Sequence, residues 1–265
     1  MSAALFFKMF RDRWRSLLAW SLVIVFMVTI QLSVYPSIKE SGDAAKDLLD
    51  SYPEAFKKMF RIEDYTTGSG FLSAELFSLM IPLVMLGVGL TWGCSATAEE
   101  EERGTADLLF SLPIRRRNIL MSKMSATFCA LLLLASITFF NVFLLEGHFE
   151  LSVSTLHLFH ACLAHLFLGV YFSGVGFLLG SLSGKRSLAL GTGIGIGIVF
   201  FIFFTLAPLV TNFKFTNPIN PFQWTIARNI LKDGLDVWGL VKLISAGTVL
   251  YIAAIVFLER REVRS

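Results

Sequence analysis

The chain has 265 residues, of which 55% are hydrophobic and only 16% are charged, and its mean hydropathy is +0.67. A soluble globular domain carries about 25% charged residues, and a disordered chain needs low hydrophobicity, so neither class fits. The 23 basic and 20 acidic residues exclude the strong positive field of a nucleic-acid-binding domain. The composition therefore predicts a polytopic membrane protein, and its three cysteines form no disulfide framework.

Six segments are apolar enough to cross a bilayer, whose core of about 30 Å needs roughly 20 helical residues. Each is expected to be a helix, because lipid offers no partner to an unpaired backbone amide. The first segment is too long for the apolar core of a cleavable signal peptide. The sequence thus predicts an all-α bundle with spans at residues 16–34, 71–92, 122–145, 158–182, 188–209 and 240–258.

Lysine and arginine are distributed unequally between the two sides of this bundle. Fourteen fall on the side that carries both termini, and nine fall on the other side, in long segments diluted by acids. Because cytoplasmic loops carry the excess of basic residues, we expect both termini to be cytoplasmic.

The N-terminal residues 1–15 combine large apolar side chains with four cations. This pattern predicts an interfacial helix on the cytoplasmic face, with its cations near anionic lipid head groups. The alternative is a charged flank to the first span.

Two longer segments are expected on the outer side. In residues 36–70, apolar positions recur at three- and four-residue steps, and Pro53 is placed to start a second short helix. This predicts a helix that lies on the membrane surface or caps the bundle, with direct contact to a substrate as the alternative. In residues 211–238, the prolines and asparagines of Asn217–Phe222 predict a turn that caps the outer mouth.

The most informative segment joins the second and third spans. The acidic run Glu99, Glu100, Glu101 and Glu102 is followed by Arg103 and Gly104, which break the helix. Thr105 can cap a new short helix over residues 105–112, where Asp107 is favourable in the first turn. Leu108, Leu109 and Leu112 form its apolar face, and Pro113 ends it. Such a face at a cytoplasmic turn needs a partner to cover it, unless the helix floats on the bilayer.

Glycines are concentrated between residues 169 and 197. Gly176, Gly180 and Gly184 recur at four-residue steps, as do Gly191 and Gly195 on the fifth span. Seams of small residues let helices approach closely, so we expect these positions to pack helices together. The alternative is that the fifth span slides against a neighbour or a second copy.

No catalytic or metal site is predicted. The segment from Gly180 to Arg186 departs from a phosphate-binding loop in its spacing and in the residue after the lysine. His157, His160 and His165 spread over about 200° of a helix, which favours outer-interface histidines over metal ligands. The chain also has no assembled nucleophile or base for an intramembrane hydrolase.

Several segments resemble the permease subunits of type-2 ABC exporters. The N-terminal FFKMFRDRWRSLLAW, the outer-loop SYPEAFKKMFRIEDYTTGSGFLSAELF and the C-terminal NPFQW and FLERREV are similar to that family. The most specific segment is EEERGTADLLFSLPIRRRNILMSK, which resembles the family's inner loop with its acidic run, Arg-Gly-Thr and Leu-rich helix.

The resemblance implies a multi-pass protein of a prokaryotic cell membrane that works as a pair of permeases, either two copies or two paralogues, embedded in membrane lipid. Two separate ATPase subunits would bind ATP and Mg, and residues 105–112 would be the coupling helix that contacts them. The flanking residues Glu99, Glu100, Glu101, Glu102, Arg103, Gly104 and Pro113 would belong to the same contact. The apolar pathway favours amphipathic peptides, lipids or hydrophobic drugs as cargo. The alternative functions are a secondary transporter or channel, which would need mid-membrane ionisable residues, and an intramembrane enzyme.

Overall fold

The structure is a computed structural model that describes residues 3–62, 64–102, 104 and 116–260. The helix expected over residues 105–112, together with Arg103 and Pro113, lies outside the described residues.

The described residues form helices joined by turns, with no strand among them, which confirms the all-α fold class. Six helical runs are long and apolar enough to cross a membrane, as expected from the sequence. Their helices are α1 (Ala3–Ser51), α3 (Gly68–Leu72) continued by η1 (Ser73–Met80) and α4 (Ile81–Glu102), α6 (Arg116–Glu146), α7 (Thr155–Ser183), α8 (Arg186–Leu206) and α11 (Val237–Arg260). The shorter helices are α2 (Glu54–Phe60), η2 (Thr211–Ile219), α9 (Pro221–Ile226) and α10 (Ile230–Asp233).

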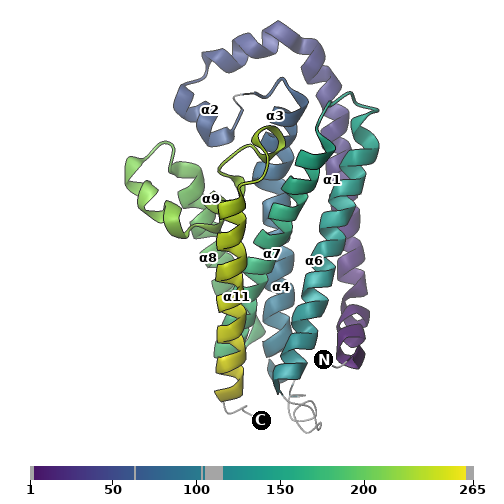
Figure 1. The fold of residues 1–265 in the computed structure, drawn as a ribbon, viewed down its shortest axis with the longest axis vertical. Coiled ribbons are helices and arrows are strands. Elements are labelled where there is room, and N and C mark those ends of the chain that lie inside the picture. The colour runs from purple at the N-terminus through teal and green to yellow at the C-terminus, as the bar shows by residue number, and fades with distance from the viewer. Residues whose placement is uncertain (1–2, 63, 103, 105–115, 261–265) are drawn as a thin grey trace.

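Helices α4 and α7 form the centre of the bundle. In the most apolar stretch of each of these two runs 67% of the residues are buried, against 33% or less in the other four. α7 packs against α4, α6, α8 and α11, while α1 packs mainly against α6. Figure 1 shows the two chain termini at the same end of the bundle, which we call the terminal end. The opposite end, where α2, α3 and α9 lie, is called the loop end (Figure 1).

The interfacial helix expected over residues 1–15 is continuous with the first span in the structure. From Ala3 onward these residues are the first turns of α1, which continues to Ser51 with Pro36 inside it. The reason is a single buried stripe, in which Leu5, Met9 and Leu17 continue the face that buries the residues further along α1. The first turns therefore pack against the bundle instead of lying apart from it. Beyond the bundle, the last part of α1 arches over the loop end (Figure 1).

A π-helical segment, η1, precedes α4 for a reason visible in the sequence. Pro82 has no backbone N–H and cannot donate the α-helical hydrogen bond to the carbonyl of Ser78. The hydrogen-bond register widens, so that the backbone N–H of Ile81 donates to the carbonyl of Leu76, five residues earlier. Such π-bulges leave backbone carbonyls that need another donor.

His165 on α7 meets that need. Its Nε2 lies 2.8 Å from the Phe77 carbonyl of η1, and its Nδ1 lies 2.7 Å from the Ala161 carbonyl of its own helix. The side chain is fully buried. The outer-interface position expected for this histidine is therefore wrong, because its ring joins α7 to the irregular turn of η1 inside the bundle.

The loop end is held together by capping and by polar contacts. Pro53 precedes α2 as expected, and the Asn220 side chain caps α9 by accepting from the Phe222 amide at 3.0 Å. The Tyr65 hydroxyl donates to a carboxylate oxygen of Glu75 at 2.5 Å. Burial and this hydrogen bond raise the pKa of Tyr65, so the phenol stays protonated and keeps donating.

Candidate functional site

The acidic run that ends α4 lies at the terminal end of the bundle, and two of its members have partners inside the chain. Glu99 forms an ion pair with Arg13 of α1. Glu100 accepts a hydrogen bond from the Lys123 ammonium at 2.6 Å, and the same ammonium donates to the Ala96 carbonyl at 2.7 Å. The side chain of Lys123 is only 9% exposed, so its charge needs these partners.

The same end of α4 also contacts α8. The Nε of Arg186, the first residue of α8, donates to the Ser95 hydroxyl at 2.7 Å. The tip of α4 is thereby tied to α1, α6 and α8 through one ion pair, one buried ammonium and one guanidinium. A displacement of the segment that follows Glu102 would therefore be carried into three neighbouring helices.

A cavity of about 400 Å³ lies beside these contacts, between α1, α4 and the start of α8. Its lining includes the paired Arg13, Glu99, Glu100 and Lys123, and also the cations Lys8, Arg15 and Arg186. The resemblance to the permease family places Glu99 and Glu100 beside the expected ATPase contact. The structure shows their carboxylates bonded within the chain, whereas Glu102 is exposed.

Close packing of α4 on α7 depends on glycines from both helices. A methyl group at Gly176 would lie 2.9 Å from the Leu90 carbonyl and 3.0 Å from the Cys94 nitrogen, both backbone atoms of α4. A methyl group at Gly180 would overlap the Thr97 hydroxyl, and one at Gly93 of α4 would overlap the Ser173 carbonyl. The two backbones therefore lie too close for any larger side chain at these positions.

The other glycines singled out in the sequence behave differently. Gly184 ends α7 in the left-handed conformation, with φ of 62°, where glycine has no steric penalty. Gly191 and Gly195 have open space where a side chain would be and pack against no other described helix. On the opposite face of α8, Gly193 and Gly197 contact Leu90 and Leu86 of α4 instead.

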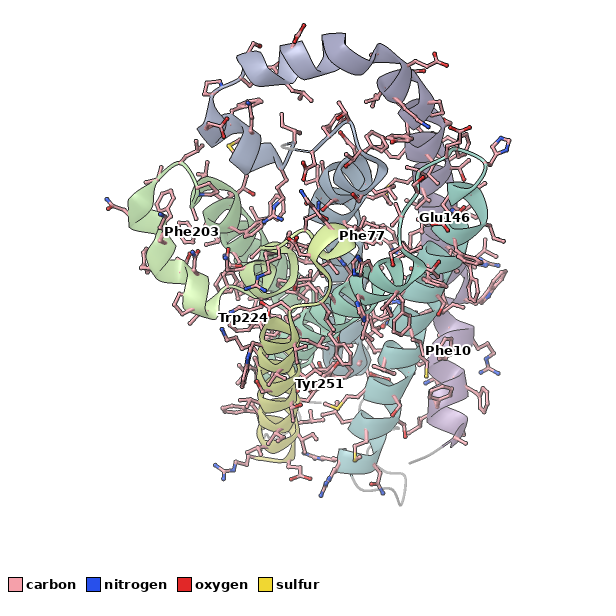
Figure 2. All side chains as sticks on the ribbon, turned by 45° about the horizontal axis from the view of Figure 1, so that its top comes forward. Phe10, Phe77, Glu146, Phe203, Trp224 and Tyr251 are labelled. Carbon is pink, nitrogen blue, oxygen red and sulfur yellow. The ribbon has the colours of Figure 1, made fainter. Side chains whose placement is uncertain are left out.

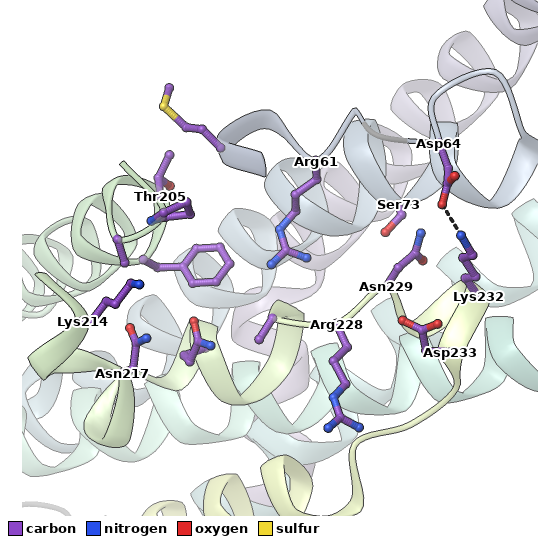
Figure 3. A pocket seen from close by; sticks show the side chains of 16 residues that line it. Arg61, Asp64, Ser73, Thr205, Lys214, Asn217, Arg228, Asn229, Lys232 and Asp233 are labelled. Carbon is purple, nitrogen blue, oxygen red and sulfur yellow. Dashed lines mark hydrogen bonds and ion pairs between the residues drawn. The ribbon is translucent and has the colours of Figure 1, made fainter. Parts of the chain in front are cut away.

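A larger cavity of about 530 Å³ lies at the loop end (Figure 3). It is formed by the turn after α2, the end of α8, η2 and the segment from α9 to α10. The Arg61 guanidinium points into it and lies 5.1 Å from the centroid of the Phe204 ring (Figure 3). Arg61 adopts a left-handed backbone, with φ of 57°, as the residue that ends α2. Sequence reasoning missed this cavity, because its lining joins residues 59–73 to residues 204–233, which are far apart in the chain.

Aromatic side chains occur at every level of the bundle, from Phe10 near the terminal end to Phe203 near the loop end (Figure 2). Among the described residues, no group of three or more histidine, cysteine, aspartate or glutamate side chains is arranged to hold a metal ion. In the described part of the molecule, large apolar side chains are exposed along the helices, and charged side chains line a cavity at each end of the bundle.

An all-helical bundle with six membrane-crossing helices and charged ends defines a multi-pass membrane protein. The family model of the ABC-2 family transporter proteins matches residues 3–261, and the chain therefore belongs to that family. It is accordingly the membrane subunit of an ABC transporter, a kind of subunit that associates with an ABC ATPase. No individual curated protein matched the chain.

Proposed function

We propose that the chain is the permease subunit of an ATP-driven exporter and that its terminal end receives the ATPase. The observation that carries this proposal is the network at the tip of α4. There Glu99, Glu100 and Ser95 bind cations of three neighbouring helices, immediately before the segment that resembles a coupling helix. Force applied to that segment would move α4 together with α1, α6 and α8.

The proposed coupling surface consists of Glu101, Glu102, Arg103 and Gly104, followed by the helix at 105–112. ATP and Mg would be bound by the partner ATPase, whose closure would push on this helix. At Gly93, Gly176 and Gly180 the backbones of α4 and α7 lie in close contact. A push on α4 would therefore displace α7 as a rigid helix and would not be absorbed by movement of side chains.

The first test of this proposal is Leu108→Asp. An aspartate on the apolar face would place an unpaired charge in the groove of the ATPase, so we expect co-purification of the cognate ATPase to fall at least tenfold. The measurement is recovery of the ATPase with detergent-solubilised permease, together with ATP-driven transport in vesicles. Leu156→Asp, at an exposed apolar position that lies just outside the predicted fourth span, is the matched control and should retain the ATPase. Full capture and full transport by Leu108→Asp would remove the coupling role from this helix.

A second test addresses orientation. In a variant whose three native cysteines are replaced, single cysteines at Ser51 and Asp107 should be labelled from opposite sides of the membrane. Ser51 ends α1 at the loop end and is exposed, and the basic residues predict that this end lies outside the cytoplasm. An impermeant maleimide added to intact cells should therefore modify position 51 and leave position 107 unmodified. Equal labelling at both positions would contradict cytoplasmic termini.

The permease is proposed to work as a pair, formed with a second copy or a paralogue, within the cell membrane of a prokaryote. The open face at Gly191 and Gly195 is available for that contact, because no described helix covers it. Amphipathic peptides, lipids or hydrophobic drugs are the proposed cargo, since many large apolar side chains are exposed on the bundle's surface. A secondary transporter is less well supported, because Glu75 in the second helical run already binds Tyr65 and Gln31.

A further inference from the structure

The cavity at the loop end has an excess of positive charge. Four cations and two carboxylates line it, and one of the carboxylates, Asp64, is already paired with Lys232 at 2.5 Å. Lys214 lines the opposite side of the cavity and has no carboxylate partner among the described residues (Figure 3). Arg61 points into the space between them. An anion entering this cavity would meet two cations from different segments.

Two side-chain amide oxygens that line the same cavity have no hydrogen-bond donor among the described atoms. The Oδ1 atoms of Asn217 and Asn229 are shielded from solvent, and neither has a hydrogen-bond partner among the described atoms. An amide oxygen that is shielded from water and accepts no hydrogen bond costs folding free energy. A ligand that carries hydroxyl or amine groups would supply the missing hydrogen-bond donor. The cavity therefore fits a head group that combines an anionic oxygen with hydrogen-bond donors.

One wall of the cavity is apolar. Phe204, Ala207 and Pro208 of the α8 end line it, and the neighbouring Leu209, Val210 and Phe215 are exposed at the surface. An acyl chain or an apolar peptide side chain could lie along this strip while a head group occupied the cavity. The volume of about 530 Å³ is within the usual range for small-molecule sites.

We propose that this cavity binds the phosphate or carboxylate head group of an amphiphile, with Arg61 and Lys214 contacting its oxyanion and the apolar strip contacting its tail. The head group could belong to a membrane phospholipid or to a transported amphiphile, because both present the same oxyanion. The inference rests on the cavity alone and not on ATP-driven export, since binding can be measured on the permease without an ATPase.

The experiment is calorimetric titration of the purified full chain in dodecyl maltoside with dodecyl phosphate, and separately with dodecanoate. We expect saturable binding that weakens roughly tenfold in Lys214→Gln and again in Arg61→Gln, because each removes a charge-assisted hydrogen bond. Lys214 is exposed, so Lys214→Gln should fold normally even if Arg61→Gln does not. Phospholipid that co-purifies with the chain and is lost in Lys214→Gln would indicate a membrane lipid, whereas saturable binding to a chain that carries no co-purified phospholipid would indicate a transported amphiphile.

Lys242→Gln is the matched control. Lys242 is exposed on the first turns of α11, near the same end of the bundle, and does not line the cavity. It should bind as the unmodified chain does. Either of two results would overturn the proposal: no saturable binding of either amphiphile, or an equal loss of affinity in Lys242→Gln and Lys214→Gln, which would reflect general attraction to a cationic surface.

Discussion

Glu100→Ala is expected to lower the free energy of unfolding by about 3 kcal/mol, because it removes the carboxylate that neutralises a buried ammonium. Lys123 would keep its hydrogen bond to the Ala96 carbonyl but lose the charge 2.6 Å away. The measurement is equilibrium unfolding of the purified chain in mixed dodecyl maltoside and SDS micelles. Removing one partner of a buried ion pair costs more stability than replacing both partners with apolar residues. The double variant Glu100→Leu with Lys123→Met should therefore recover most of the lost free energy of unfolding.

Glu102→Ala is the control for this experiment. Glu102 belongs to the same acidic run and the same helix but is exposed, so its removal should change stability by less than about 0.5 kcal/mol. If Glu100→Ala and Glu102→Ala unfolded at the same SDS fraction, the pair between α4 and α6 would contribute nothing, and the proposed transmission through the tip of α4 would lose its basis.

Gly176→Leu is expected to destabilise the bundle by about 3 kcal/mol, at the upper end of the usual cost of overpacking. Even the first carbon of the new side chain would press on the Leu90 carbonyl and the Cys94 amide, and backbone atoms cannot rotate away as a flexible side chain can. The central helices α4 and α7 would have to separate along their length. The same micellar unfolding experiment measures this, with circular dichroism to show that the helices themselves remain.

Gly191→Leu provides the comparison within the same glycine-rich region. Its side chain would enter open space, so the stability of a single chain should stay within about 0.5 kcal/mol of the unmodified protein. A loss as large as that of Gly176→Leu would show that the two glycine faces are equivalent, contrary to the structure. A selective loss of permease pairing in Gly191→Leu would instead support the proposed contact with a second permease.

The sequence by itself determined the six membrane-crossing helices, because each depends on a local run of apolar residues that lipid requires to be helical. It also determined the start of α2 after Pro53 and the break in the chain at Asn220 before α9, since both follow from the chemistry of one or two residues. The coupling segment was recognisable only as a pattern, and it lies outside the described residues, so its role stays a prediction.

The tertiary structure decided which neighbour each helix face meets. Periodicity places Gly176 and Gly191 on faces of their helices, but only the packed bundle shows that the first contacts α4 and the second faces open space. In the same way, the acidic run showed four carboxylates without showing that Arg13 and Lys123 would reach two of them. These pairings join residues 23 to 86 positions apart, and the loop-end cavity joins segments still further apart. Such distances depend on how whole helices pack, which local sequence does not encode.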